Sequence, residues 1–338
     1  MEVLLGKTFK EIQQIVEELN MPRFAAKQIT QWLYQKKASS IDEMSNISLK
    51  HRQILKDKYT IGRTDFIGKQ ESTDKTVKYL FATNNNRFIE SVYIPEKERA
   101  TLCVSSQVGC KMNCLFCMTG KQGFAGQLTS GDILNQIISI PESNSLTNIV
   151  YMGMGEPLDN LEELFKSLEI ITSDYGFGWS PKRITVSTIG PLPALKRFLE
   201  ESKVHLAISL HSPFHFERLS LMPIEKAYPL SDVIHLIKQY DFSHQRRVSF
   251  EYILFAGLND DFKHALALSR LIKDIPCRVN LIKYHRIPEI NLPASDTNKM
   301  VEFRDFLNDR GIACTIRTSR GEDILAACGM LSTNKNKE

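Results

Sequence analysis

The stretch CVSSQVGCKMNCLFCMTGKQGFAG, from Cys103 to Gly126, holds four of the seven cysteines of the chain. Cys110, Cys114 and Cys117 follow a C-x3-C-x2-C spacing, and Cys103 lies seven residues before the first of them. Thiols this close together usually share a metal. Zinc normally takes four ligands in two separated pairs, and no second pair or nearby histidine follows. Three cysteines instead suit a [4Fe–4S] cluster whose fourth iron stays open to a substrate.

The composition indicates a folded protein without a membrane contact. The chain has 338 residues, of which 42% are hydrophobic, enough for a packed core and for two domains. No apolar run reaches the length of a membrane span, and residues 1–20 lack the apolar centre of a signal peptide, so we expect a cytoplasmic protein. An odd number of cysteines, three of them clustered, argues against a secreted disulfide framework.

The formal net charge of +4 lies wholly in residues 1–90, which contain 15 basic and 11 acidic residues. A solvated surface is the ordinary explanation for so small an excess. The functional interpretation is a contribution to binding an RNA backbone. The charge alone leaves both interpretations open.

The first 94 residues predict an accessory domain that is helical and then β-rich. Apolar residues at helical spacing predict helices over residues 7–20, 24–37 and 49–58. The pattern then changes to short β-like pieces, at residues 59–68, 76–83 and 87–95. Three asparagines at 84–86 are typical of a turn. We expect this domain, residues 1–94, to lead directly into the core.

The rest of the chain alternates between strand-like and helix-like pieces. The strand-like pieces are residues 100–106, 147–153, 182–188, 203–210, 247–254, 278–284 and 313–319. The helix-like pieces between them are residues 130–140, 160–173, 191–201, 230–240, 261–273 and 296–310. Six such units imply parallel strands with right-handed crossovers, and therefore an α/β fold with a partial (β/α)6 barrel over 95–322 and a tail over 323–338. A doubly wound sheet is the alternative from the pattern alone.

Chemically informative residues follow the strand-like pieces. In parallel α/β barrels the active site forms at the carboxyl ends of the strands. The cysteine stretch follows the first strand, and the other candidates are Gly155 and Glu156 after the second, Ser187 at the end of the third, Ser209, Leu210 and His211 at the end of the fourth, and His285 after the sixth. This common position predicts one shared site.

Each motif also has an ordinary explanation. Residues 153–157, GMGEP, would form a tight turn with an acid at the start of a helix. A serine at a strand end caps a helix more often than it binds a ligand. Cys328, in a tail of small residues, would be a buried apolar cysteine. Cys277 and Cys314 fit strand positions and are predicted to be structural.

Five segments in order, between Arg99 and Gly329, resemble one known family. They are RATLCVSSQVGC, CMTGKQGF, MGMGEP, SLHSP and DILAACG, and they are similar to the RlmN/Cfr RNA methyltransferases of the radical S-adenosylmethionine (SAM) superfamily. The resemblance implies that Cys110, Cys114 and Cys117 bind a [4Fe–4S] cluster. It also implies SAM contacts at Gly155, Glu156, Ser187, Ser209, Leu210, His211 and His285. The family commonly carries asparagine where this chain has His285, a difference that a backbone contact to adenine tolerates better than a side-chain contact.

The resemblance also implies a mechanism. One SAM methylates Cys328, and a second, reduced by the cluster, yields methionine and a 5′-deoxyadenosyl radical that takes hydrogen from the methylated sulfur. The resulting methylene radical adds to carbon 2 of adenine, which is too electron-poor to attack SAM directly. Cys103 resolves the protein–RNA adduct by forming a disulfide with Cys328. Glu90 removes the C2 proton as general base.

On this resemblance the product is 2-methyladenosine, in the peptidyl-transferase centre of 23S rRNA and in the anticodon loop of tRNA. The target base must be unpaired or splayed out to reach the barrel mouth, over which the tail is expected to fold. The enzyme is expected to be a monomer that uses two SAM per turnover and an electron donor such as flavodoxin or ferredoxin. Candidates for holding the RNA are Lys27, Lys36, Lys37, Lys50 and Arg52.

Two alternatives remain. A Cfr-type enzyme, which modifies C8 of the same rRNA adenosine, carries all of these residues. The segments RGEDILAACG and CMTGKQGF nevertheless look more like RlmN. The alternative from another class is a non-catalytic RNA-binding protein with a structural zinc site.

Overall fold

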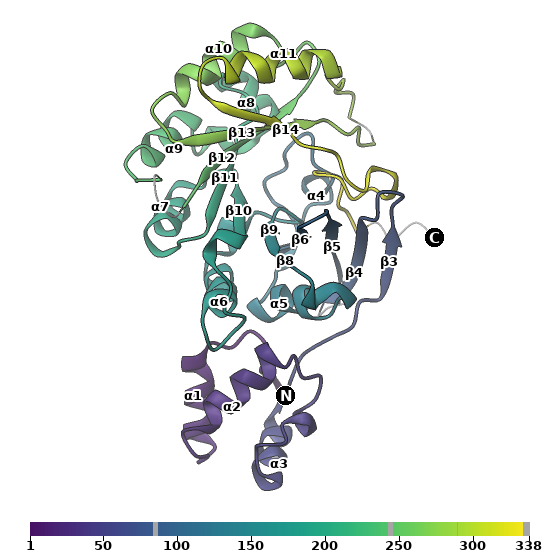
Figure 1. The fold of residues 1–338 in the computed structure, drawn as a ribbon, viewed down its shortest axis with the longest axis vertical. Helices are drawn as coiled ribbons and strands as arrows, with labels where there is room; N and C mark the ends of the chain where they lie inside the picture. Colours follow the sequence, from purple (N-terminus) through teal and green to yellow (C-terminus); the bar gives the residue numbers. More distant parts are fainter. Residues whose placement is uncertain (84–86, 243–245, 289, 334–338) are drawn as a thin grey trace.

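A computed structural model describes residues 1–83, 87–242, 246–288 and 290–333. In Figure 1 a helical module at the N-terminus extends from a larger α/β body. The module contains α1 (Phe9–Glu18), α2 (Ala25–Thr30), a π-helical turn (Gln31–Gln35), a 3-10 turn (Ile41–Glu43), α3 (Leu49–Lys58) and the parallel strand pair β1 (Glu2–Val3) and β2 (Tyr59–Thr60). The three predicted helical segments are confirmed. The second is shorter as an α-helix than expected, because its last turn is π-helical.

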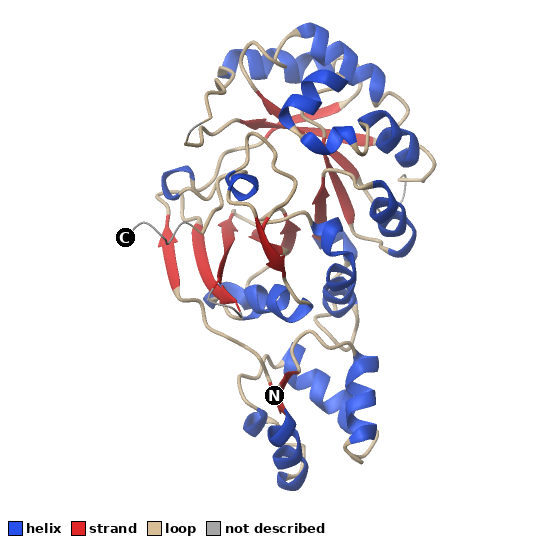
Figure 2. Cartoon of the chain, turned by 180° about the vertical axis from the view of Figure 1, so that it is seen from behind, coloured by secondary structure: helices blue, strands red, loops and turns tan. Residues whose placement is uncertain are grey.

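The module is fixed to the body by buried contacts at its base. The Ser130 hydroxyl donates a 2.9 Å hydrogen bond to the Gly6 carbonyl, and the Thr64 amide donates to Asn135 Oδ1, also at 2.9 Å. The Lys37 ammonium reaches Ser143 Oγ at 2.7 Å. Figure 2 shows the module beneath the body from the opposite side. We infer that module and body form one packed unit.

One ten-stranded sheet forms the body. Its order is β14-β13-β12-β11-β10-β9-β6-β5-β4-β3. The seven parallel strands are β6 (Ala100–Cys103), β9 (Asn148–Tyr151), β10 (Ile184–Thr188), β11 (His205–Ser209), β12 (Val248–Leu254), β13 (Cys277–Lys283) and β14 (Ala313–Ile316). A doubly wound sheet reverses its strand order at a switch point, and this order has no reversal, so that alternative is wrong.

Helices between the parallel strands cover the outside of the curved sheet (Figures 1 and 2). They are α5 (Ser130–Ile138), α6 (Leu161–Thr172), α7 (Leu192–Glu201), α9 (Leu230–Ile237), α10 (Phe262–Leu271) and α11 (Thr297–Asn308). The edge strands β14 and β3 do not pair with each other, so the barrel stays open, which confirms the partial (β/α)6 prediction. Across the part of the chain that the structure describes, no helix has the length and apolar character needed to cross a membrane.

Three antiparallel strands continue the same sheet at one edge. They are β3 (Gly68–Glu71), β4 (Val77–Thr83) and β5 (Arg87–Pro95), and β5 pairs with β6. The expected boundary between residues 94 and 95 therefore falls within one continuous sheet. The turn expected at 84–86 lies outside the described residues.

Several short elements were not anticipated from the sequence. A hairpin of β7 (Gln107–Gly109) and β8 (Phe124–Gln127) encloses the cysteine loop, which also contains α4 (Met118–Lys121). Helix α8 (His215–Leu221) follows β11. Short 3-10 turns lie at Pro141–Asn144, Pro157–Asn160, Pro181–Arg183, Pro223–Lys226 and Glu322–Ile324.

The tail crosses the opening between β14 and β3. In Figure 1 the yellow chain beyond β14 runs toward the upper ends of β3 and β4. At the turn between those strands, Ser72 Oγ and the Thr73 amide donate to the Asp323 carboxylate at 2.5 and 3.1 Å. The Gly321 amide donates to Asp74 Oδ2 at 3.1 Å. The tail is thus tied to both ends of the open sheet.

Asp323→Ala should loosen the tail without unfolding the body, since it removes two hydrogen bonds together worth about 1–3 kcal/mol. We expect limited proteolysis to cleave the tail several-fold faster than in the native chain, with little change in the thermal midpoint. Asp305→Ala, which removes an exposed aspartate from α11, is the matched control. Equal cleavage of the two variants would contradict this anchoring role.

Candidate active site

One cavity of about 190 Å³ at the carboxyl ends of the strands collects most of the predicted site. Its lining includes Cys110, Cys114, Cys117, Gly155, Glu156, Ser187, Ser209, His211, Cys103 and Cys328. These residues come from the carboxyl ends of four parallel strands, from the loops that follow them, and from the tail. The prediction of one shared site is consistent with this arrangement.

The β7–β8 hairpin shapes the cysteine loop. The Cys110 amide donates to the Gly123 carbonyl at 3.0 Å, which closes the loop at its base. Gly109 adopts a φ of +73°, and a Cβ there would lie 1.7 Å from the Gly123 carbonyl oxygen, so only glycine fits. Farther along, the Leu115 amide donates to the Leu221 carbonyl at 2.8 Å. These bonds fold the loop back over the cavity.

The three loop cysteines fit a cluster better than a single ion. Within the described ranges, no three cysteine, histidine or carboxylate side chains converge on one metal position. In a [4Fe–4S] cluster each cysteine binds a different iron, so such convergence is not required. Burial raises the pKa of Cys110 to about 12 and that of Cys114 well above its usual value, so bound iron must displace their protons.

The Gly155–Glu156 turn links two strand ends. Gly155 has a φ of +99°, and a Cβ there would lie 2.5 Å from the Gln107 side chain. The Glu156 carboxylate accepts hydrogen bonds from the Leu158 amide at 3.0 Å, Thr188 Oγ1 at 2.6 Å and the Ile189 amide at 3.0 Å. Burial raises the pKa of Glu156 to about 7, and these donors act in the opposite direction.

His211 enters the cavity as a neutral ring. Its φ of +58° is left-handed, and its Nδ1 accepts from the Ile253 amide at 3.0 Å, which leaves the ring proton on Nε2. The ring packs edge-on against Phe116 at a centroid distance of 4.8 Å. Burial, assisted by the charge of Arg218, lowers the pKa of His211 to about 3.

Two predicted contacts lie outside this cavity. Leu210 is fully buried, and its amide donates to the Glu251 carbonyl at 3.0 Å. His285 lines an adjoining cavity instead, with its Nε2 3.0 Å from Ser319 Oγ and its Nδ1 3.2 Å from Glu322 Oε1. The position of His285 after its strand was predicted, but its contacts are to the segment beyond β14.

Cys103 and Cys328 face the same cavity from different elements. Cys103 ends β6 and is buried, and burial raises its pKa to about 12. Cys328 lies on the tail and is the one exposed cysteine. All seven cysteines are free thiols in this structure. Two of the others, Cys277 in β13 and Cys314 in β14, pack against the core.

The tail separates Glu90 from that cavity. Glu90, on β5, lines a different cavity of about 810 Å³ together with tail residues Leu325 and Met330. Its Oε1 lies 3.1 Å from the Lys78 ammonium, and its Oε2 accepts from the Ser332 amide at 3.0 Å. Glu90 and Cys328 therefore line different cavities, and residues of the tail contribute to both.

The adjoining cavity, of about 410 Å³, is rich in arginine. It shares Cys328 with the cysteine cavity, and its lining includes Arg99, Arg247, Arg278, Arg317 and Arg320. Arg317 lies 3.6 Å from Glu251, but among the described residues no carboxylate pairs with the other four. The unpaired cations leave this cavity attractive to anions.

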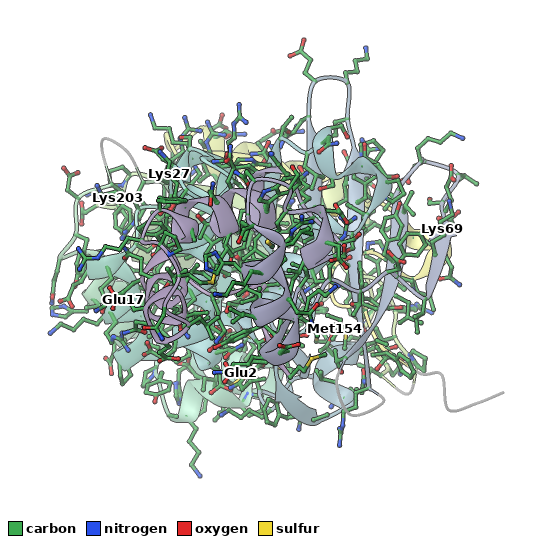
Figure 3. All side chains as sticks on the ribbon, turned by 90° about the horizontal axis from the view of Figure 1, so that it is seen from below. Glu2, Glu17, Lys27, Lys69, Met154 and Lys203 are labelled. Atoms are coloured by element: carbon green, nitrogen blue, oxygen red, sulfur yellow. The ribbon has the colours of Figure 1, made fainter. Side chains whose placement is uncertain are left out.

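The basic residues of the module divide into two groups. Lys37 and Arg52 are bonded to the protein's own backbone, Lys37 to the Ser143 carbonyl at 3.3 Å and Arg52 to the Asp42 carbonyl at 2.6 Å. Lys27, Lys36 and Lys50 are exposed. Figure 3, seen from below, places Lys27 on the opposite side of the molecule from Lys69 of β3.

Three supporting residues escaped the sequence analysis. Thr188 holds Glu156, and Lys78 holds Glu90. Arg218 is fully buried, forms an ion pair with Glu225, and donates to the backbone carbonyls of Ile189, Ser209 and Leu210. None of the three lies in a recognisable sequence motif, and only their contacts in the folded structure identify them.

Comparisons with known protein families agree with this geometry. The model of the radical SAM superfamily matches residues 104–268, from the cysteine loop into α10. The model of the ribosomal RNA large subunit methyltransferase N-terminal domain matches residues 3–61, the helical module. Membership of the radical SAM superfamily implies a [4Fe–4S] cluster and SAM as cofactors.

Relatives match this chain along their whole length. A probable dual-specificity RNA methyltransferase RlmN from Parabacteroides distasonis is 65% identical over 98% of this chain and 97% of its own. The dual-specificity RNA methyltransferase RlmN from a Nitratiruptor species is 41% identical over 98% of each. The crystal structure of a radical SAM methyltransferase from Sphaerobacter thermophilus has a TM-score of 0.92 at 36% identity, covering 98% of this chain and 99% of that one. By identity, coverage and fold, the chain belongs to the RlmN family of radical SAM RNA methyltransferases.

Proposed function

We propose that this chain makes 2-methyladenosine in 23S rRNA and in tRNA through an S-methylcysteine at Cys328. The observation that carries the proposal is that the tail brings Cys328 into one cavity with Cys103 and the C-x3-C-x2-C cysteines. Direct methyl transfer from SAM needs no thiol on the enzyme. Transfer through sulfur needs a thiol that can approach both SAM and RNA, and the exposure of Cys328 supports that role.

The cavity residues divide between the two cofactors. Cys110, Cys114 and Cys117 would hold the cluster, and Gly155, Glu156, Ser187, Ser209 and His211 would bind SAM. Bound together, the cluster and SAM supply the radical chemistry that an electron-poor adenine carbon requires. Three donors occupy the Glu156 carboxylate, which has about four acceptor positions, so one remains for the SAM ammonium. Leu210 would act through its backbone, and His285 from the adjoining cavity.

Three residues would complete the transfer. Cys328 carries the carbon to adenine C2, Glu90 accepts the C2 proton, and Cys103 forms a disulfide with Cys328 that releases the methylated base. The burial of Cys103 keeps it as a neutral thiol until the adduct forms. Because Glu90 and Cys328 line different cavities, transfer by this route requires the tail segment to shift when RNA enters.

RNA is the ligand that fits the arginine-lined cavity. A phosphate would pair with Arg320, which follows β14, while a splayed base reaches Cys328 at the shared end. Arg99, Arg247 and Arg278 stand at the amino ends of β6, β12 and β13 and would act on the RNA only through their charge. Exposed lysines of the module, Lys27, Lys36 and Lys50, would add contacts farther along the RNA. We further propose a reduced flavodoxin or ferredoxin as electron donor and a monomeric, cytoplasmic enzyme.

Changing Cys110, Cys114 or Cys117 to alanine should abolish iron incorporation and SAM cleavage together, because each sulfur holds a different iron. Iron and sulfide analysis after anaerobic reconstitution, with measurement of 5′-deoxyadenosine, checks this. Cys277→Ala, which removes a cysteine on β13, is the control and should keep both. A normal cluster spectrum in any of the three variants would remove that residue from the ligand set.

Cys103→Ala should still methylate Cys328 and attach to RNA but should fail to release product. A covalent protein–RNA species should accumulate on denaturing gels and persist after nuclease trimming. Cys314→Ser, which alters a buried cysteine that does not line the cavity, should show no such species. Free turnover without the adduct would show that Cys103 is structural.

Cys328→Ala should bind SAM and RNA but make no methyladenosine, because no sulfur remains to carry the carbon. Isotope labelling separates this route from direct transfer. Enzyme that already carries an unlabelled methyl on Cys328, supplied with CD3-labelled SAM, should first give unlabelled product. Later turnovers should give a methyl with two deuteriums and one hydrogen that does not come from SAM. A product that retains three deuteriums would rule out the carrier role.

A further inference from the structure

Lys78 and Glu90 form a buried ion pair that no sequence motif indicates. The two lie on neighbouring antiparallel strands, where Leu80 is the direct partner of Glu90, so Lys78 is its diagonal neighbour on the same face. Their charged groups are 3.1 Å apart, and the side chains are only 11% and 7% exposed. Burying two charges is costly unless they are paired, so a pair this enclosed calls for an explanation.

The two carboxylate oxygens of Glu90 have different kinds of partner. Oε1 faces Lys78, which is fixed in the sheet, whereas Oε2 accepts from the amide of Ser332, four residues beyond Cys328. A shift of the tail would break only the second bond. Oε2 would then be free to act while Lys78 still held Oε1.

The charge of Lys78 also acts against the effect of burial on the pKa of Glu90. Burial raises the pKa of Glu90, and the Lys78 charge and hydrogen bond are the main effects that oppose this rise, with a smaller one from the Ser332 amide. Lys69 and Arg286 line the same cavity, but among the described residues neither lies within ion-pair distance of Glu90. Without Lys78, burial would favour the protonated acid, which cannot accept a proton.

We propose that Lys78 is a positioning residue that keeps Glu90 ionised and aims its free oxygen at the adenine of the protein–RNA adduct. This inference rests on the proposed function, in which Glu90 is the base. In that step the C2–H bond of the adduct breaks, the proton passes to Glu90 Oε2, and the electron pair stays in the adenine ring. Lys78 touches no reacting atom and acts only through Glu90.

The test uses reconstituted holoenzyme and an RNA hairpin that contains the substrate adenosine. For Lys78→Gln, methylation of Cys328 and SAM cleavage should match the native enzyme, which also shows that the variant is folded. Burial already raises the pKa of Glu90, and loss of Lys78 should raise it further. Adduct resolution in the variant should then fall about tenfold for each pH unit below that pKa and should recover at higher pH. Native enzyme and Lys78→Arg should resolve the adduct across the neutral range.

Two further variants make the outcomes distinct. Glu90→Gln should accumulate adduct at every pH, since no carboxylate remains to ionise. Lys196→Gln, which removes a lysine from the exposed pair with Glu200, should keep the native pH profile. A native profile for Lys78→Gln, or a loss that is equal at all pH values, would overturn the role of Lys78. A fully active Glu90→Gln enzyme would instead overturn the assignment of Glu90 in the proposed function, and the Lys78 inference with it.

Discussion

The parallel order of β6 and β9 to β14 is the constraint on which the site depends. Strands that run in one direction bring all their carboxyl ends to one edge, so residues far apart in the sequence meet there. Buried polar groups then bind these ends to one another. Glu156, after β9, accepts from Thr188 and Ile189 at the end of β10. Arg218 donates to carbonyls at the ends of β10 and β11.

The same strand order leaves the barrel open, and the tail makes use of the opening. Cys328 is carried by a segment tied at Asp323 to the β3–β4 turn and, through the Met118 amide and the Gly329 carbonyl, to the cysteine loop at 2.8 Å. A residue in a sheet cannot move without disturbing its neighbours. The tail is held by separate hydrogen bonds and by a few buried side chains, among them Ala326 and Leu331, rather than by a continuous strand ladder. Such contacts can be exchanged in steps, which suits the carrier role that we propose for Cys328.

Most of the fold was predictable because the longer helices and strands of the barrel have a clear period in the sequence, which the short elements of the cysteine loop lack. The place of Glu156 and His211 in the cavity was predictable from their position at strand ends, and that of the three loop cysteines from their spacing. His285 occupies the predicted strand end, but its ring faces Ser319 and Glu322, which no local pattern specifies. Lys78 was missed because its role depends on the register of β4 against β5, and a lysine in a strand is otherwise an ordinary surface residue.

The two buried glutamates of the site, Glu156 and Glu90, differ in where their hydrogen-bond partners lie. Glu156 receives its three hydrogen bonds from residues in or beside the sheet, none of which belongs to the tail. Glu90 has one fixed partner in Lys78 and one on the movable tail. A general base needs a lone pair within reach of the proton, and loss of the Ser332 contact would provide one on Glu90, in keeping with the proton transfer that we propose for it. The carboxylate whose donors are all fixed is suited to holding the strand ends around SAM.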